Sequence, residues 1–238
     1  LLFTLLQGRN GLKPNTSLIA ALLAGVLVVL GAASGLIAAG IDWLELGGRG
    51  NDGNAYLQMT TWVTGTQSLL IYGAGLMGVV AALHWWSPKI WGRRLNEGLG
   101  SLSVLLVFVG AALAVTGPAL SGLLTDQPDF VYGDPNLTSL YGGLVDDSGA
   151  EGLSALGAVG VAVALAGVAL VLLNLVASIL LRKGAEADND PWSAQTPEWL
   201  LESPPPLGPS GQLTNITSGT PLLDAAEASA ADAEEVTV

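Results

Sequence analysis

Cysteine is absent from the 238 residues of the chain, and histidine occurs once, at His84. Without a thiol the chain can form neither a disulfide nor a thiolate metal site, so the sequence gives no information about the redox compartment. Any metal or haem site would have to rest on one imidazole and weaker ligands. The sequence therefore predicts no metal site in this chain.

Charged residues are scarce as well. They make up 12% of the chain, against about 25% in an average soluble domain. Half of the residues are hydrophobic, and the mean hydropathy is +0.55. This composition predicts a membrane protein that contacts lipid. Only eight Lys and Arg residues stand against 20 Asp and Glu, so nucleic acid is not expected as a partner.

Long apolar runs supply the positive signal. Four stretches are long enough to cross a hydrocarbon core of about 30 Å, which takes roughly 20 helical residues. They are residues 16–41, 57–86, 102–124 and 153–181. A lone strand cannot satisfy its backbone groups in lipid, so each stretch should be a helix. We expect an all-α membrane protein with four transmembrane helices.

The distribution of cations predicts the orientation of the helices, because cytoplasmic loops hold the excess of Lys and Arg. The loops and ends on one side carry nearly all of them: Arg9, Lys13, Lys89, Arg93, Arg94, Arg182 and Lys183. Only Arg49 falls on the other side. We expect a multi-pass protein of the cell (plasma) membrane with both termini in the cytoplasm.

The composition changes along the chain and suggests four parts. They are an interfacial segment at 1–15, a four-helix domain at 16–183, an extended Trp- and Pro-rich docking segment at 184–210 and an acidic flexible tail at 211–238. The proline run favours extended backbone, and the acidic end has little apolar surface to bury. Trp192 and Trp199 are the expected docking points. The chain begins with Leu, which leaves an upstream portion open, and no cleaved signal peptide is expected.

One stretch, HWWSPKIWGRRLNEGLG at 84–100, combines aromatic rings, cations and a proline. From the residues alone it is an interfacial anchor, with tryptophans at headgroup depth and cations near anionic lipid heads. We expect Pro88 to stop the preceding helix. We expect His84 to hold its polar tip toward water at the interface rather than to bind a ligand.

Polar residues inside the spans must find partners in lipid, and we expect them to bond to neighbouring helices. They are Gln58, Thr60, Thr61, Thr64, Thr66, Gln67, Ser68 and Asn174. A substrate path through the Thr and Gln cluster is the less favoured reading, because no intramembrane carboxylate or Lys accompanies it. Gly31 with Gly35, and the group Gly73, Gly75 and Gly78, indicate close helix contact.

Two motifs resemble a known family. The stretch at 84–100 resembles the cytoplasmic link between the tenth and eleventh helices of cytochrome c oxidase subunit I, where an aromatic pair, Pro-Lys, Gly-Arg and Leu-Asn-Glu-x-Leu-Gly recur. The stretch NDPWSAQTPEWLLESPPP is similar to the C-terminal segment of that family, and LLFTLLQGRN to the segment before its ninth helix. The resemblance implies helices nine to twelve of that fold, followed by an extended Pro-rich C-terminal tail.

The chain departs from the family where the family holds its haems. The resemblance implies a His-x-His pair on the tenth helix, yet YLQMTTWVTGTQSLLIYG contains no histidine. It also implies an Arg pair that binds haem propionates between the eleventh and twelfth helices, and the loop at 125–152 has neither Arg nor Lys. We therefore expect no cofactor in this chain, with haem and copper held by partner subunits.

The leading hypothesis is a haem-free, subunit-I-like accessory subunit of a respiratory cytochrome c oxidase complex or supercomplex. One alternative is a piece of a divided or longer catalytic subunit I of an oxygen-reducing, proton-pumping oxidase. Another is a small transporter or free-standing membrane scaffold. Residues expected to contact partner subunits or lipid heads are Trp91, Arg93, Arg94, Trp192, Trp199, Pro204, Pro205 and Pro206.

Overall fold

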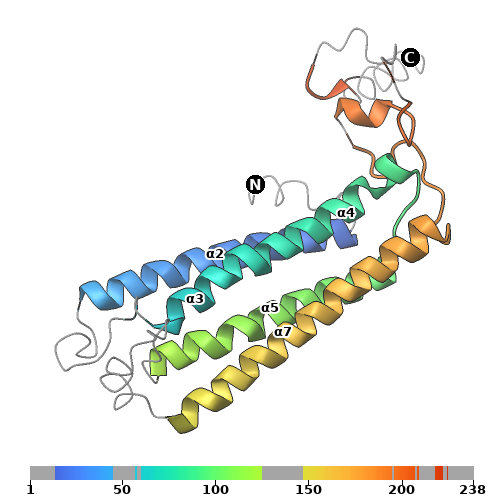
Figure 1. Cartoon of the computed structure of the whole chain (residues 1–238). Helices are drawn as coiled ribbons and strands as arrows, with labels where there is room; N and C mark the ends of the chain where they lie inside the picture. Colours follow the sequence, from blue (N-terminus) through green and yellow to red (C-terminus); the bar gives the residue numbers. More distant parts are fainter. Residues whose placement is uncertain are drawn as a thin grey trace. The chain divides into compact units, whose positions relative to one another are not determined.

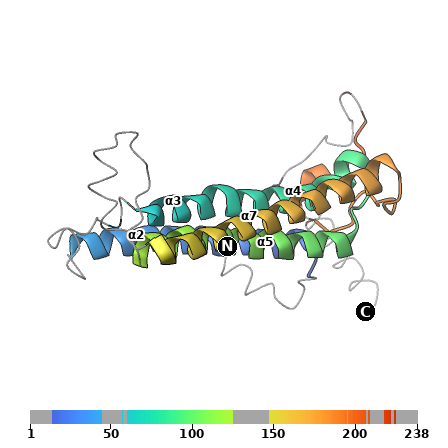
Figure 2. The ribbon, with the colours of Figure 1, turned by 60° about the horizontal axis from the view of Figure 1, so that its bottom comes forward.

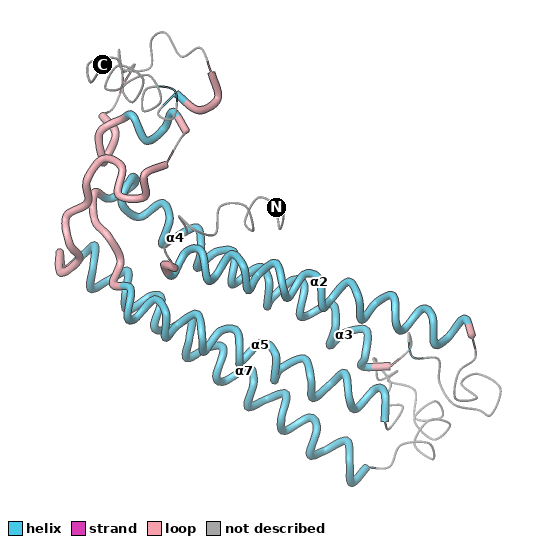
Figure 3. Tube along the Cα trace, turned by 180° about the vertical axis from the view of Figure 1, so that it is seen from behind, coloured by secondary structure: helices cyan, strands magenta, loops and turns pink. Residues whose placement is uncertain are grey.

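The computed structural model of the chain consists of helices joined by loops and turns, and no strand is drawn in the part that it describes (Figure 3). The described residues are 14–44, 57, 60–124, 147–194, 196–206, 208, 218–221 and 224. They form two compact units. The first comprises Leu1–Ala82 with Glu97–Leu172, and the second comprises Leu83–Asn96 with Leu173–Val238.

Four long helical segments account for most of the described chain (Figure 1). In chain order the elements are α2 (Thr16–Trp43), α3 (Thr61–Ser68), the π-helical η3 (Leu69–Ala74), α4 (Gly75–Trp91), α5 (Glu97–Leu124), α7 (Asp147–Leu175), the π-helical η4 (Val176–Leu180) and the 3₁₀ turn η5 (Pro197–Leu200). The elements α3, η3 and α4 follow one another without a break.

Four helices of the described chain are long and apolar enough to cross a membrane: Thr16–Ile41, Thr61–Trp91, Glu97–Leu124 and Gly152–Leu180. They confirm the all-α membrane fold and its four spans. The third begins five residues earlier than expected, because Glu97 occupies the first turn of α5, where a carboxylate complements the helix dipole. Its Oε2 accepts hydrogen bonds from the Thr16 backbone N–H (2.9 Å) and hydroxyl (2.6 Å).

The expectation that Pro88 ends its helix is wrong, because α4 continues to Trp91. A proline inside a helix leaves the carbonyl four residues earlier without its donor. That carbonyl belongs to His84, and the Ser87 hydroxyl donates to it over 3.3 Å. The helix ends instead at Gly92, whose φ of +64° lies in the left-handed region that glycine tolerates.

Glycines bring helices of the first unit into backbone contact. A Cβ added at Gly110 or Gly160 of α5 and α7 would overlap backbone atoms of Ala164 and Ala114 on the facing helix. One added at Gly122 would lie 2.6 Å from the Thr60 hydroxyl oxygen, beside the start of α3. Figure 2 shows these helices running alongside one another. Small residues therefore set the spacing, as expected for helices that meet in lipid.

The glycines singled out from the sequence divide into two groups. A Cβ at Gly31 would lie 2.5 Å from the Leu70 side chain, and one at Gly73 would lie 3.3 Å from Ala111. Both positions are close contacts, as expected. A Cβ added at Gly35, Gly75 or Gly78 would meet no atom of another described element within 4 Å.

Hydroxyl groups in the spans of the first unit donate to backbone carbonyls, as expected for polar groups in lipid. Thr61 donates to Pro118 of α5 (2.8 Å), and Ser17 of α2 donates to Ala81 of α4 (2.9 Å). Thr66 donates within its own helix to Val63 (3.1 Å). Gln58 lies outside the described residues. Thr61 therefore bonds to a neighbouring helix as expected, whereas Thr66 bonds within its own helix and lines a pocket of about 360 Å³ against α2.

Candidate functional site

The second unit contains an aromatic cluster that joins the end of α4 to the C-terminal segment. Trp85 and Trp192 stack with ring centroids 5.6 Å apart and an interplanar angle of 12°. Trp199 meets Trp85 edge-on at 5.5 Å and stacks with Trp86 at 6.0 Å. These arrangements are the ones that aromatic quadrupoles favour. We call Trp85, Trp86, Trp192 and Trp199 the tryptophan cluster.

Trp199 is the most deeply buried ring of the cluster, at 2% exposure. The single turn η5 positions it, with Pro197 at the start of the turn fixing the backbone. The Lys89 ammonium lies 5.1 Å from the ring centroid. Among the described residues, no acceptor lies within hydrogen-bond distance of the buried Trp199 indole nitrogen. Packing and the cation therefore hold this ring.

Trp192 is held by directional bonds. Its indole N–H donates to the Trp85 carbonyl over 3.0 Å, and the Arg94 guanidinium lies 4.8 Å from its ring centroid. Asp190 orders the turn that contains Trp192, because its side chain accepts hydrogen bonds from the backbone N–H groups of Trp192 (3.3 Å) and Ala194 (3.0 Å). The Asp-Pro-Trp order thus has a physical reason: the carboxylate organises the turn that presents the ring.

Lys89 ties two parts of the C-terminal segment to α4. Its side chain is buried, with the residue 5% exposed. The ammonium donates to the carbonyls of Asn189 (3.1 Å) and Leu201 (2.6 Å). Asn189 in turn accepts from the Ser203 N–H through its side-chain oxygen, over 3.0 Å. Lys89 was expected only as one of the cytoplasmic cations and was not among the expected contact residues.

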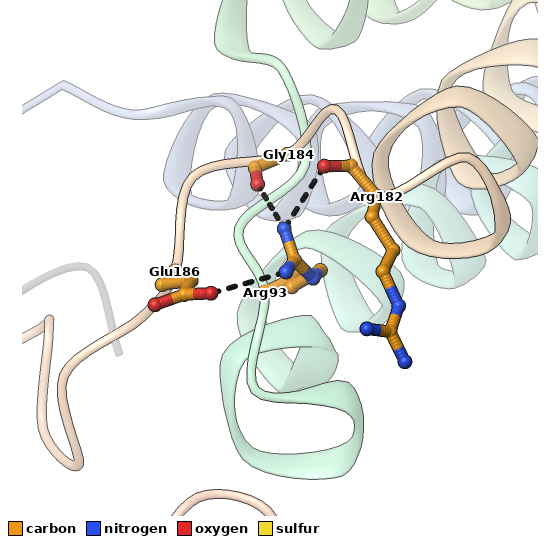
Figure 4. A network of polar contacts seen from close by, with 4 residues as sticks. All are labelled: Arg93, Arg182, Gly184 and Glu186. Carbon is orange, nitrogen blue, oxygen red and sulfur yellow. Dashed lines mark hydrogen bonds and ion pairs between the residues drawn. The ribbon is translucent and has the colours of Figure 1, made fainter.

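Arg93 organises the turn that follows the fourth span (Figure 4). One of its terminal nitrogens donates to the carbonyls of Arg182 (3.0 Å) and Gly184 (2.8 Å), and the other donates to Glu186 (3.2 Å). The backbones of the two segments also pair, since Ala187 N–H donates to the Gly92 carbonyl over 3.0 Å. The planar fork of a guanidinium suits this several-way contact.

Asn174 of α7 holds the link between α4 and α5. It is fully buried, and it exchanges two 2.9 Å hydrogen bonds with the backbone N–H and carbonyl of Asn96. The Ser178 hydroxyl donates to its side-chain oxygen over 3.0 Å. The expected hydrogen bond of this intramembrane amide is present, although its partner is the link between α4 and α5 rather than a helix.

The structure brings together Arg93, Arg94, Trp192 and Trp199 from the expected contact residues. Trp91 is 37% exposed and, with Pro204, lines a shallow pocket beside Arg93. Pro205 and Pro206 are exposed. The contacts described above lie within this chain, so contact with partner subunits or lipid heads stays a prediction for all eight. Trp85 and Trp86, which receive the C-terminal segment, were assigned only an interfacial role.

His84 does not hold its ring toward water as expected. It is 2% exposed, and its neighbours Trp85 and Trp86 both pack against Trp199. The expectation failed because the sequence places an aromatic helix end at the interface without showing that another segment covers it. Within the described part of the chain, no three His, Cys, Asp or Glu residues form a group that could hold a metal ion.

Comparison with known proteins agrees with the two motifs. The family model for Cytochrome C and Quinol oxidase polypeptide I matches residues 1–142. The heme-copper oxidase subunit I+III of Aeropyrum pernix is 30% identical over 207 residues, which are 86% of this chain and 22% of that protein. Cytochrome c oxidase subunit 1 of Bacillus subtilis is 32% identical over 64% of this chain and 23% of its own length.

A further relative, cytochrome c oxidase subunit 1 of Thermostichus vulcanus, is 26% identical over 82% of this chain and 32% of its own length. The chain thus spans a fifth to a third of the curated relatives that it matches. The family match takes in the first three spans and the link at 84–100, while the longer alignments continue toward the C-terminal segment. The chain belongs to the Cytochrome C and Quinol oxidase polypeptide I family.

Proposed function

We propose that the chain is a haem-free accessory subunit of a respiratory cytochrome c oxidase complex or a larger respiratory assembly. It contributes packed membrane helices and a folded C-terminal segment, and its partner subunits carry the haem and copper. Family membership supports the oxidase setting. The cell membrane as location, with both termini in the cytoplasm, is part of the same proposal.

One observation carries the accessory role: the chain has a single histidine. A haem iron needs at least one strong axial ligand from the protein, and imidazole is the usual one. His84 is the only imidazole, and it lies buried beside the tryptophan cluster near the end of α4. Residues 56–73, where the family resemblance implies a ligand pair, contain none. One side chain cannot replace two ligands to two haems.

Close glycine contacts favour a packing role. Along α5 and α7, Gly110, Gly117 and Gly160 leave no space for even a methyl group between the facing backbones. Many large apolar side chains on α2, α7 and η4 are exposed, including Val29, Leu36, Leu165 and Leu180. Such surfaces are the ones that lipid or neighbouring subunits cover.

Purification of the tagged chain from its native membranes tests the proposal. We expect haem-containing subunits to accompany it, visible as a reduced-minus-oxidised haem spectrum in the preparation. The isolated chain should carry no haem of its own in a pyridine haemochrome assay. A preparation that consists of this chain alone and is colourless would contradict the proposed assembly.

A second candidate is a piece of a divided catalytic subunit I. It is favoured by the alignments, in which the chain matches 22–32% of the length of subunit I relatives. Histidines from another chain would then have to complete the haem sites. Stoichiometric haem bound by this chain together with one partner, at an interface that includes α3, would favour this candidate over the accessory subunit.

The absence of cysteine makes the orientation directly testable. Single cysteines can be introduced at Ser218, near the C-terminus, and at Asn51, between the first two spans. We expect a membrane-impermeant maleimide added to intact cells to label N51C and not S218C. The reverse pattern would invert the proposed orientation.

A further inference from the structure

A pocket of about 480 Å³ opens in the second unit beside the Arg93 network. Trp91 and Arg93 line it from the end of α4 and the turn that follows, and Ile179 and Arg182 line it from the end of η4. Glu186, Ala187, Ser203 and Pro204 line it from the C-terminal segment. The lining is mostly polar, which sets this pocket apart from the apolar surfaces of the spans.

The pocket lies where two membrane spans end. Trp91 is the last residue of the second span, and Ile179 is the last but one of the fourth. The ends of spanning helices lie at the level of lipid head groups, where tryptophan rings are enriched. The pocket therefore opens at head-group level, with Trp91 and Ile179 as its apolar side.

The charges of the lining leave one cation available. Arg93 and Glu186 form an ion pair of 3.2 Å. The Arg182 guanidinium extends away from that network (Figure 4), and none of the described residues accepts a hydrogen bond from it or pairs with it. Two arginines and one glutamate give the lining a net charge of +1, which matches the single negative charge of a phosphodiester.

The backbone holds Arg182 in a set position. Its φ is +53°, an uncommon value for a residue other than glycine. Two contacts maintain this conformation: its carbonyl accepts from Arg93 over 3.0 Å, and its N–H donates to Ile179 over 3.4 Å. Arg93 thus fixes the turn that carries Arg182, which lines the pocket. The planar guanidinium of an arginine can bind two phosphate oxygens at once.

We propose that this pocket binds the phosphate group of an anionic phospholipid. The Arg182 guanidinium binds the phosphate oxygens, while Trp91 and Ile179 contact the glycerol and the upper part of an acyl chain. Free phosphate carries the same charged group, but it has no apolar part that could contact Trp91 and Ile179. The site is independent of the proposed function, because an accessory subunit and a catalytic piece would both present it to the membrane.

The test uses the delipidated full chain in a non-ionic detergent, with binding followed by native mass spectrometry. The probes are dioleoylphosphatidylglycerol, dioleoylphosphatidylcholine and inorganic phosphate. We expect one phosphatidylglycerol to bind per chain, at least tenfold more tightly than phosphatidylcholine, and inorganic phosphate to compete poorly.

Two variants and a matched control locate the site. Arg182→Gln should weaken phosphatidylglycerol binding at least tenfold, because it removes the available guanidinium. Lys183→Gln makes the same charge change one residue later, outside the pocket lining, and should change binding less than twofold. Ala187→Leu keeps every charge and adds bulk to the lining of the pocket, so it should also weaken binding several-fold. Circular dichroism confirms that each variant is folded.

Three results would overturn the proposal. Equal binding by R182Q and K183Q would remove Arg182 from the site. Wild-type binding by folded A187L would place the lipid elsewhere. Inorganic phosphate that binds as tightly as phosphatidylglycerol would mean an anion site without a lipid.

Discussion

Each of the two units of this chain is stabilised internally by a different kind of contact. In the first unit, α5 and α7 meet through glycines, and the backbones themselves touch. In the second unit, four tryptophans and the cations Lys89 and Arg94 fill the contacts. Lipid provides no hydrophobic drive between helices, so close approach is what stabilises a contact there. Near water, large aromatic rings stabilise a contact because they bury apolar surface that would otherwise face water.

The largest effect is expected where the second unit loses a ring. Trp199→Ala removes a side chain that is 2% exposed and in contact with Trp85 and Trp86. Truncation of a buried tryptophan typically destabilises by about 3–5 kcal/mol. We expect the C-terminal segment to detach from α4 and to be cut by a protease that spares the wild type. Trp43→Ala, at a ring that is 81% exposed, is the control and should leave the digestion pattern unchanged.

A bulky residue should break the first unit in the opposite way, by addition. Gly160→Val places a Cβ on the backbone of Ala114 and forces α5 and α7 apart. Overpacking of this kind lowers the free energy of unfolding by about 1–3 kcal/mol. We expect the upper end because the atoms in the way are backbone atoms, which have no alternative rotamer. The midpoint of unfolding in mixed detergent micelles measures it. Gly25→Val makes the same change where no atom lies within 4 Å, and an equal loss there would refute the glycine-contact explanation.

A smaller loss is expected from the polar contact of the second unit. Asn174→Leu removes the partner of both backbone groups of Asn96. The two bonds are partly buried, and loss of such partners costs about 1–3 kcal/mol, so we expect a loss of about 2 kcal/mol in the same unfolding measurement. Ser178→Ala removes only the bond to the Asn174 side chain and should cost about 1 kcal/mol. A loss from S178A as large as that from N174L would contradict this ranking.

The smallest effects are expected at the exposed ion pair. Glu186→Gln removes a carboxylate that is 86% exposed, and such pairs contribute about 0–1 kcal/mol. Arg93→Lys should cost more, about 1–2 kcal/mol, because an ammonium cannot serve the carbonyls of Arg182 and Gly184 together with Glu186. Unfolding at low and high salt separates them: the E186Q difference should vanish in high salt, and the R93K difference should persist.

The spans could be predicted from sequence because a run of about 20 apolar residues leaves the backbone no alternative to a helix. Their ends could not. Glu97 extends α5 beyond its apolar run because it accepts a hydrogen bond from Thr16 of α2, and α4 passes Pro88 because the Ser87 hydroxyl donates to the His84 carbonyl of the same helix. Apolar length determines where a helix must exist, while single polar contacts determine where it stops.

The candidate site was predictable in its parts and not in its assembly. Trp192 and Trp199 stood out as docking points because large rings are rare in a polar, Pro-rich segment. Their target on α4 could not be derived, since Trp85 and Trp192 are 107 residues apart and no local pattern encodes the pairing. The tightest glycines, Gly110, Gly117 and Gly160, were missed for a related reason: with 32 glycines, spacing alone does not reveal which helix faces meet.

The separation of Trp85 from Trp192 also has a consequence during synthesis. At about 5–20 residues per second, a ribosome makes the end of α4 roughly 5–20 seconds before the segment that covers it. Throughout that interval Trp85, Trp86 and Lys89 lack their contacts with Trp192, Trp199 and Leu201. A chain that ends before Trp192 lacks the Trp192 and Trp199 rings that stack on Trp85 and Trp86.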